Sequence, residues 1–224
     1  AGDALTTGSQ NTALGYRALS AATTVPSQTA VGYNALVAST SGTDNTAVGT
    51  HVLSANTSGD KNTSVGYGSL GANTSADSNT AVGWNTLAAN TTGASNTALG
   101  AYALDSNTTA ANNTSVGFAA AAATTTGADN TALGSNALGT NTTGASNTAT
   151  GVSALQNSTT GANNVAVGHF ASKLNTTGHE NTSTGRDAML TNTTGAENTA
   201  VGYAALFSNT SADNNTAIGR LALY

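Results

Sequence analysis

An unbroken period of 17 residues constrains the fold of this chain more than any other feature. Twelve complete copies follow one another over residues 11–214 without insertion or deletion, and a partial copy of ten residues occupies each end. The motif Asn-Thr-Ala/Ser-X-Gly starts at residues 11, 45, 62, 79, 96, 113, 130, 147, 181, 198 and 215. Variants of the motif start at Gln28 and Asn164. Because stacked repeats share a continuous core, the sequence predicts one array over residues 1–224, with no linker and no second domain.

Composition alone would suggest disorder, since only 7% of the 224 residues are charged and 4% are aromatic. Such a chain has little apolar surface to offset its conformational entropy, and regular stacking of repeats is what can supply a core. Five Lys and Arg residues in the whole chain argue against a nucleic-acid-binding groove. Cysteine is absent, which excludes disulfides and thiolate metal sites. The sequence contains no run of about 18 apolar residues, so it does not predict a membrane-spanning helix.

The repeat favours a β-solenoid over a helical array. Each copy contains Gly, Asn and several Thr, which are poor helix formers, and no apolar stripe recurs at helical spacing. Propeller blades need about 40 residues per unit, far more than this period provides. The sequence therefore predicts an all-β fold, a parallel β-solenoid (β-roll) of about thirteen 17-residue coils, with strands about 4.8 Å apart.

Numbering each repeat from its Asn gives every position an expected role. Position 4 is mostly Val or Leu, so we expect positions 2 and 4 to face inward, together with Leu at position 9 and Thr at position 13. Position 3, always Ala or Ser, is then expected outward, where a small side chain would let another copy of the chain pack closely. Gly at position 5 predicts a corner with positive φ or a close backbone approach. Asn at position 1 predicts a hydrogen-bonded ladder between coils, with ligand contact as the alternative.

These residues resemble a known class of surface proteins. Residues 28–36 read QTAVGYNAL, which is similar to repeats of trimeric autotransporter adhesin heads, and the "NTAVGY-AL--NTTG" pattern is closer still to arrays in phage tail-fibre proteins. The resemblance covers nearly the whole chain and implies an extracellular β-roll, often of three chains side by side, that serves as a shaft or adhesive head. Adhesin-head repeats are usually shorter, so the resemblance does not carry over handedness or trimer geometry.

Titratable residues do not form a recognisable catalytic or metal site. His51, His169 and His179 occupy different positions of the repeat and are interpreted as scattered surface imidazoles. Acidic residues collect at positions 16 and 17, which is typical of a solubilising turn and lacks the glycine pattern of a calcium-binding array. The sequence therefore predicts no enzyme, no metal and no cofactor.

Two columns of side chains are candidate binding sites. Aromatic residues recur at position 6 and are expected to line one edge, where they would pack against a neighbouring chain or stack on sugar rings: Tyr16, Tyr33, Tyr67, Trp84, Phe118 and Tyr203. Asn-Thr-Thr/Ser recurs at positions 12 to 14, so eight residues are formal glycan acceptors: Asn56, Asn73, Asn90, Asn107, Asn141, Asn175, Asn192 and Asn209. The simpler interpretation of the second column is that Asn and Thr suit a β-corner.

The sequence favours a non-enzymatic extracellular fibre or adhesin shaft, at a cell surface or on a virion. We expect a homo-oligomer, a trimer or a filament, with a surface glycan or receptor as a further partner. Both ends of the chain stop in mid-coil, which is expected either of a segment of a longer fibre or of chains that join end to end. The alternative function is ice binding by a regular Thr/Asn face. That alternative is weak if only positions 12 and 14 face outward, and it strengthens if positions 2 and 13 do so.

Overall fold

The computed structural model describes all 224 residues, which form two compact units, Ala1–Asn112 and Asn113–Tyr224. Each unit is built from three-residue strands joined by turns, and neither contains a helix. The first unit contains β1 (Thr12–Leu14), β2 (Thr29–Val31), β3 (Thr46–Val48), β4 (Thr63–Val65), β5 (Thr80–Val82) and β6 (Thr97–Leu99). The second contains β7 (Thr114–Val116), β8 (Thr131–Leu133), β9 (Thr148–Thr150), β10 (Val165–Val167), β11 (Thr182–Thr184), β12 (Thr199–Val201) and β13 (Thr216–Ile218).

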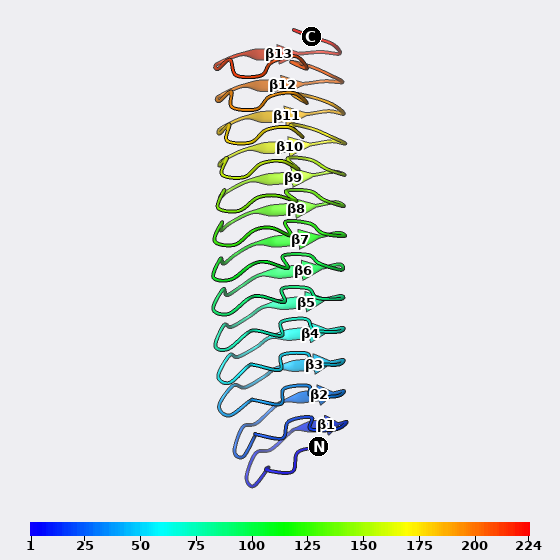
Figure 1. Cartoon of the computed structure of the whole chain (residues 1–224), viewed down its shortest axis with the longest axis vertical. Coiled ribbons are helices and arrows are strands. Elements are labelled where there is room, and N and C mark those ends of the chain that lie inside the picture. Colours follow the sequence, from blue (N-terminus) through cyan, green and yellow to red (C-terminus); the bar gives the residue numbers. More distant parts are fainter. The chain divides into compact units, whose positions relative to one another are not determined.

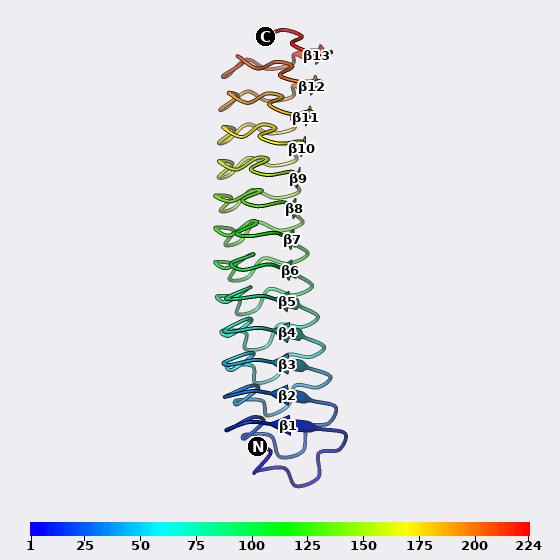
Figure 2. The same cartoon turned by 90° about the vertical axis from the view of Figure 1, so that its right-hand side faces the viewer.

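Successive strands within each unit pair in parallel, with a register offset of one repeat. Thr46 of β3 lies opposite Thr63 of β4, and Thr182 of β11 lies opposite Thr199 of β12. The strands of each unit therefore lie one above the next, with the same direction, in both views (Figures 1 and 2). This arrangement confirms the predicted parallel β-solenoid with one 17-residue coil per repeat.

The strands face the opposite way from the prediction. Ala30 and Ala47 at position 3 are completely buried, whereas the flanking Thr and Val at positions 2 and 4 are half-buried or exposed. The expectation that positions 2 and 4 face inward and position 3 outward is therefore wrong. Small side chains at position 3 fill the interior and do not form a surface for close packing with another copy.

A narrow interior explains the inversion. Leu at position 9 is buried as predicted, for example Leu53 and Leu87, and it fills most of the available width. The side chains at positions 3 and 8 meet directly across the remaining space, because the hydroxyl oxygens of Ser64 and Ser69 are 2.6 Å apart. Position 3 carries only Ala or Ser at this contact and the larger Val and Leu of position 4 lie outside, although the facing position 8 also holds the buried Val52 and Thr86.

The prediction for Thr at position 13 is also wrong. These side chains face outward, and most of their hydroxyls donate to the carbonyl oxygen of the same position one coil further on. The Thr57 hydroxyl donates to the Thr74 carbonyl over 3.0 Å, and the Thr176 hydroxyl donates to the Thr193 carbonyl over 2.9 Å. Asn at position 12, which was expected to face outward, points into the core instead. The third wall of the coil therefore presents Thr to solvent and an amide to the interior.

The corners rely on left-handed backbone conformations. Gly49 at position 5 has a φ of 136°, and a Cβ at this residue would lie 1.8 Å from the carbonyl oxygen of Gly66 in the next coil. Both reasons predicted for the glycine, positive φ and close backbone approach, are confirmed. Ordinary residues also adopt positive φ at positions 7, 9 and 17 of most coils, as Asn85, Leu87 and Ser95 do. The tight corners at these positions are what fold 17 residues into one turn.

Candidate binding surfaces

A ladder of hydrogen-bonded Asn side chains at position 1 connects each coil to the next. Asn62 donates from its backbone nitrogen and from Nδ2 to Oδ1 of Asn45, over 2.9 and 3.1 Å. The same Nδ2 also donates to the Ala76 carbonyl over 2.8 Å. Equivalent bonds recur along both units, and the amides are buried. The predicted Asn ladder is confirmed, and these buried amides do not face a ligand.

The eight candidate glycan acceptors lie in a second column of amides, which form a ladder interrupted at Thr124 and Ser158. Seven of them are fully buried and the last, Asn209, is half-buried. Asn73 illustrates the pattern, because its Nδ2 donates to Oδ1 of Asn56 over 2.9 Å and to the Ala76 carbonyl over 3.1 Å. Since a glycan would need the same Nδ2 exposed, this geometry supports the interpretation of the Asn-Thr-Thr/Ser runs as corners of the coil.

The aromatic residues at position 6 are exposed on one edge, and several stack on each other. The rings of Tyr16 and Tyr33 are 5.5 Å apart and those of Tyr67 and Trp84 are 4.4 Å apart, each pair with an interplanar angle of 13°. These rings cover one another's faces within the chain, so they present mainly their edges outward. A sugar ring would have to displace a stacked neighbour to reach a ring face. The exposed edges of these rings suit packing against a flat protein surface better than they suit stacking on sugar rings.

A regular uncharged surface lies on the outer side of the strands, and we call it the sheet face. It consists of the side chains at positions 2 and 4, which are Thr or Val at position 2 and Val, Leu, Ile or Thr at position 4. No charged residue occupies either position. Apolar members are well exposed, with Leu99 at 47% and Val201 at 37%. The sequence alone did not identify this surface, since its Val and Thr pattern is also that of a core-facing strand.

The hydroxyls of the sheet face differ from those of the third wall. Thr at position 13 uses its hydroxyl to bond the next coil, as Thr57 and Thr74 do. Thr at position 2, such as Thr63 and Thr80, makes no side-chain hydrogen bond within the protein. The sheet face therefore offers rows of unused hydroxyls next to rows of methyl groups, repeated about every 4.8 Å.

Titratable side chains are spread over the outer surface. His51 and His169 contact aromatic rings, and no three His, Asp or Glu residues converge on a point that could hold a metal ion. Asp105 is half-buried, and this burial raises the pKa of its carboxyl above the usual range. None of these groups lies with a partner in an arrangement typical of acid–base chemistry.

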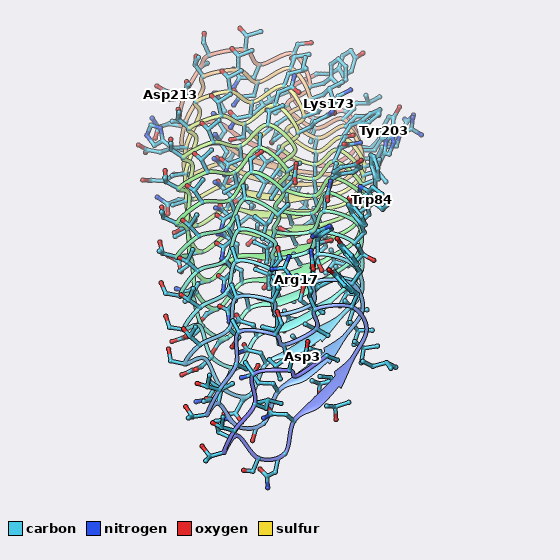
Figure 3. All side chains as sticks on the ribbon, turned by 60° about the horizontal axis from the view of Figure 1, so that its bottom comes forward. Asp3, Arg17, Trp84, Lys173, Tyr203 and Asp213 are labelled. Carbon is cyan, nitrogen blue, oxygen red and sulfur yellow. The ribbon has the colours of Figure 1, made fainter.

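The second unit has two oppositely charged edges. At positions 6 and 10 it presents Lys173, Arg186 and Arg220, and the rings of Phe170 and Tyr203 lie beneath these cations. The turn at positions 16 and 17 presents exposed carboxylates, which belong to Asp129, Glu180, Glu197 and Asp213. Lys173 and Tyr203 lie on the opposite side of the unit from Asp213 (Figure 3). The sequence indicated the acidic turn, but it did not reveal the basic edge because its residues are far apart in the chain.

Comparison with protein-family models, with curated proteins and with solved structures finds no match to this chain. The structure contains no helix of the length and apolarity needed to cross a lipid bilayer.

Proposed function

We propose that the chain is a non-enzymatic structural segment of an extracellular fibre or adhesin shaft, which associates with further copies of itself. The observation that carries the proposal is the sheet face. Its Val, Leu and Ile side chains form a half-buried to exposed apolar row along each unit, flanked by Thr, interrupted by Thr150 and Thr184 in the second unit and without a charge. Continuous exposed apolar surface is typical of a protein–protein contact, and covering it with another copy would stabilise the assembly.

The interior of the coil supports a structural role. A buried amide ladder at position 1 and a parallel backbone ladder recur along each unit, and a second amide ladder at position 12 joins those successive coils that both carry Asn there. Networks in which every coil bonds its neighbour make a stiff element, because a local opening breaks bonds to both adjacent coils. Such a scaffold suits a shaft that displays an edge or a face, and a cell surface or a virion is the proposed location.

The test is the state of association of the whole chain. We expect sedimentation velocity to show oligomers that grow with concentration and electron microscopy to show elongated assemblies. Val65→Lys combined with Val82→Lys places two charges on the sheet face and should weaken the association. The control, Thr74→Lys with Thr92→Lys, adds the same charge on the third wall and should leave association unchanged. A wild-type chain that stays monomeric at high concentration would contradict the proposal.

A second candidate function, ice binding, is favoured by the unused hydroxyls of the sheet face. Positions 2 and 13 both face outward, which is the arrangement that strengthens this alternative, and only position 2 leaves its hydroxyls free. Rows of hydroxyl and methyl groups about 4.8 Å apart match a repeat distance of the ice lattice closely enough to order water. This surface would then bind an ice plane where the fibre proposal places another copy.

Thermal hysteresis separates the two candidates. If the sheet face binds ice, monomeric protein should depress the freezing point below the melting point and shape ice crystals. Thr80→Tyr in the centre of the face should abolish this activity, whereas Thr92→Tyr on the third wall should preserve it. Absence of hysteresis in concentrated wild-type protein would remove ice binding and leave the fibre proposal as the only one.

A further inference from the structure

The two charged edges of the second unit differ in their chemistry. Three of the five Lys and Arg residues of the chain lie on the basic edge, which we define by Lys173, Arg186, Tyr203 and Arg220. The acidic edge is defined by Glu180, Glu197 and Asp213. A chain with a net charge of −5 would repel its copies if its charges were mixed evenly, whereas separated edges allow attraction.

Aromatic contacts order the basic edge. The guanidinium groups of Arg186 and Arg220 lie on either side of the Tyr203 ring, at 6.0 and 5.6 Å from its centroid. The Lys173 ammonium lies 4.4 Å from the centroid of Phe170. Cation–π contacts hold the long side chains in place, which reduces the entropy lost when they bind a carboxylate.

One carboxylate lies on the basic edge and does not neutralise it. Asp187 accepts a hydrogen bond from Nε of Arg186 over 3.1 Å, and the aspartate side chain is only 13% exposed whereas the arginine is 65% exposed. Asp187 therefore lies beneath the arginine and engages its inner nitrogen. The outer nitrogens of the guanidinium face solvent, where they can form a bidentate pair with a carboxylate from another molecule.

The acidic edge presents carboxylates held by a tight turn. Glu180 and Glu197 occupy position 17 of successive coils, each with a φ of 57°, and both side chains are exposed. Asp213 accepts a hydrogen bond from the Ala196 nitrogen over 2.7 Å through one oxygen. The only basic group in this part of the turn is His179 at position 16. These carboxylates form no ion pair within the chain.

The geometry points to a second copy of this chain as the partner of both edges: we propose that copies pack side by side, in parallel, with the basic edge of one against the acidic edge of the next. Both edges repeat with the same coil spacing, so a pair of parallel copies brings Arg186 to the level of Glu180 or Glu197. The two contact surfaces differ, which makes the contact heterologous, and it either closes into a ring or continues as an open assembly. This inference rests on the proposed self-association. It adds that neighbouring copies run parallel and that their contact depends on opposite charges.

Charge reversal tests the contact. Arg186→Glu with Arg220→Glu replaces positive charges of the basic edge by negative ones, and Glu180→Lys with Glu197→Lys replaces negative charges of the acidic edge by positive ones. The second pair is compatible with the turn, since Lys61 already occupies position 17 of another coil with a φ of 57°. We expect each variant alone to associate at least about tenfold more weakly than the wild type in sedimentation experiments. Mixing the two variants in equal amounts should restore association, because each then finds a complementary partner.

Controls distinguish this inference from the proposed function. Arg17→Glu with Lys61→Glu changes the net charge by the same amount in the first unit and should associate as the wild type does. Wild-type association should also weaken as salt is raised, since partly exposed pairs are screened. If the wild type associates but neither reversed variant is weakened, or the mixture fails to recover, the edge contact is wrong and the fibre proposal stands. If the wild type does not associate at all, both fall.

Discussion

At the scale of single residues, the coil depends on a few positions where only one side chain fits. Gly at position 5 combines positive φ with an approach of the next coil too close for any Cβ, as at Gly49 and Gly66. The Asn residues at positions 1 and 12 bond the adjacent coil through their amides within the core, as Asn62 and Asn73 do. These roles could be predicted in part from the sequence, because a glycine present in every repeat and an asparagine present in nearly every repeat at position 1 report a shared backbone requirement. Burial of the position-12 amides could not be predicted, since Asn-Thr-Thr also suits an exposed turn.

Replacement of a position-5 glycine should be severely destabilising. Gly49→Ala would place a Cβ against the Gly66 carbonyl in a left-handed conformation, and we expect a loss of about 3 kcal/mol or more in the free energy of unfolding. Gly71→Ala is the matched control, because its Cβ would come no closer than 3.1 Å to another atom and other coils carry side chains at that position. Chemical unfolding followed by circular dichroism measures both. Equal stability of the two variants would contradict the assigned corner geometry.

Removal of one rung of the second ladder should also be costly. Asn73→Ala removes one of the two donors to the Asn56 oxygen and one of the two acceptors of the Asn90 amide nitrogen, so we expect a loss of about 1–3 kcal/mol. Asn157→Ala, at a half-buried position without a side-chain hydrogen bond, should change stability by less than about 0.5 kcal/mol. Thermal unfolding of the two variants provides the comparison, and a neutral Asn73→Ala would show that the ladder contributes little.

The half-buried Asp105 predicts a pH dependence of stability. Its pKa is raised in the folded state by burial, so the folded protein binds the proton more tightly than the unfolded chain. The free energy of unfolding should therefore be highest below the unfolded pKa and should fall as the pH rises through the folded pKa. Asp105→Asn should flatten this part of the profile and raise stability at neutral pH. An unchanged pH profile in the variant would show that Asp105 is not the cause.

At the scale of the strand, the central result is the inversion of the expected faces. The period, the parallel pairing and the inward Leu at position 9 were all predictable, because they follow from repetition and from a large apolar residue. The facing of residues 2 to 4 was not, since Thr-Ala-Val fits an alternating strand in either orientation. What decides it is the short distance to the opposite wall, where the small position-3 side chain meets position 8 directly, as Ser64 meets Ser69. A three-residue strand carries no local signal of that distance.

Two leucines of the first unit test this inversion. Leu87 is completely buried at position 9, whereas Leu99 on the sheet face is 47% exposed. We expect Leu87→Ala to lower the free energy of unfolding by about 2–5 kcal/mol, because it opens a cavity between coils. Leu99→Ala should cost less than about 1 kcal/mol in dilute protein, since it leaves no cavity. If urea unfolding showed Leu99→Ala to be more destabilising than Leu87→Ala, position 4 would have to lie in the core and the inversion would be wrong.

At the scale of the whole molecule, function depends on what covers the surfaces that the coils leave exposed. The sheet face of each unit is uncharged and carries Thr beside apolar side chains, and in the second unit the basic residues lie at one edge and the acidic turn at another. The fibre and the ice-binding proposals differ only in the partner of the sheet face, and both require Thr and Val at positions 2 and 4 to point outward. The small residues at position 3 are buried, so lateral packing of copies would rely on the exposed Val and Leu row at position 4.

Single-cysteine labelling of one strand measures this orientation most directly. The chain has no cysteine, so Thr63→Cys and Ser64→Cys each introduce one thiol into β4, and the second substitution closely preserves the size of the side chain. In dilute native protein, a maleimide should label the cysteine at residue 63 rapidly and the one at residue 64 only on unfolding, because Ser64 is completely buried. Rapid labelling at residue 64 with protection at residue 63 would contradict the account, since the sheet face would then be the core.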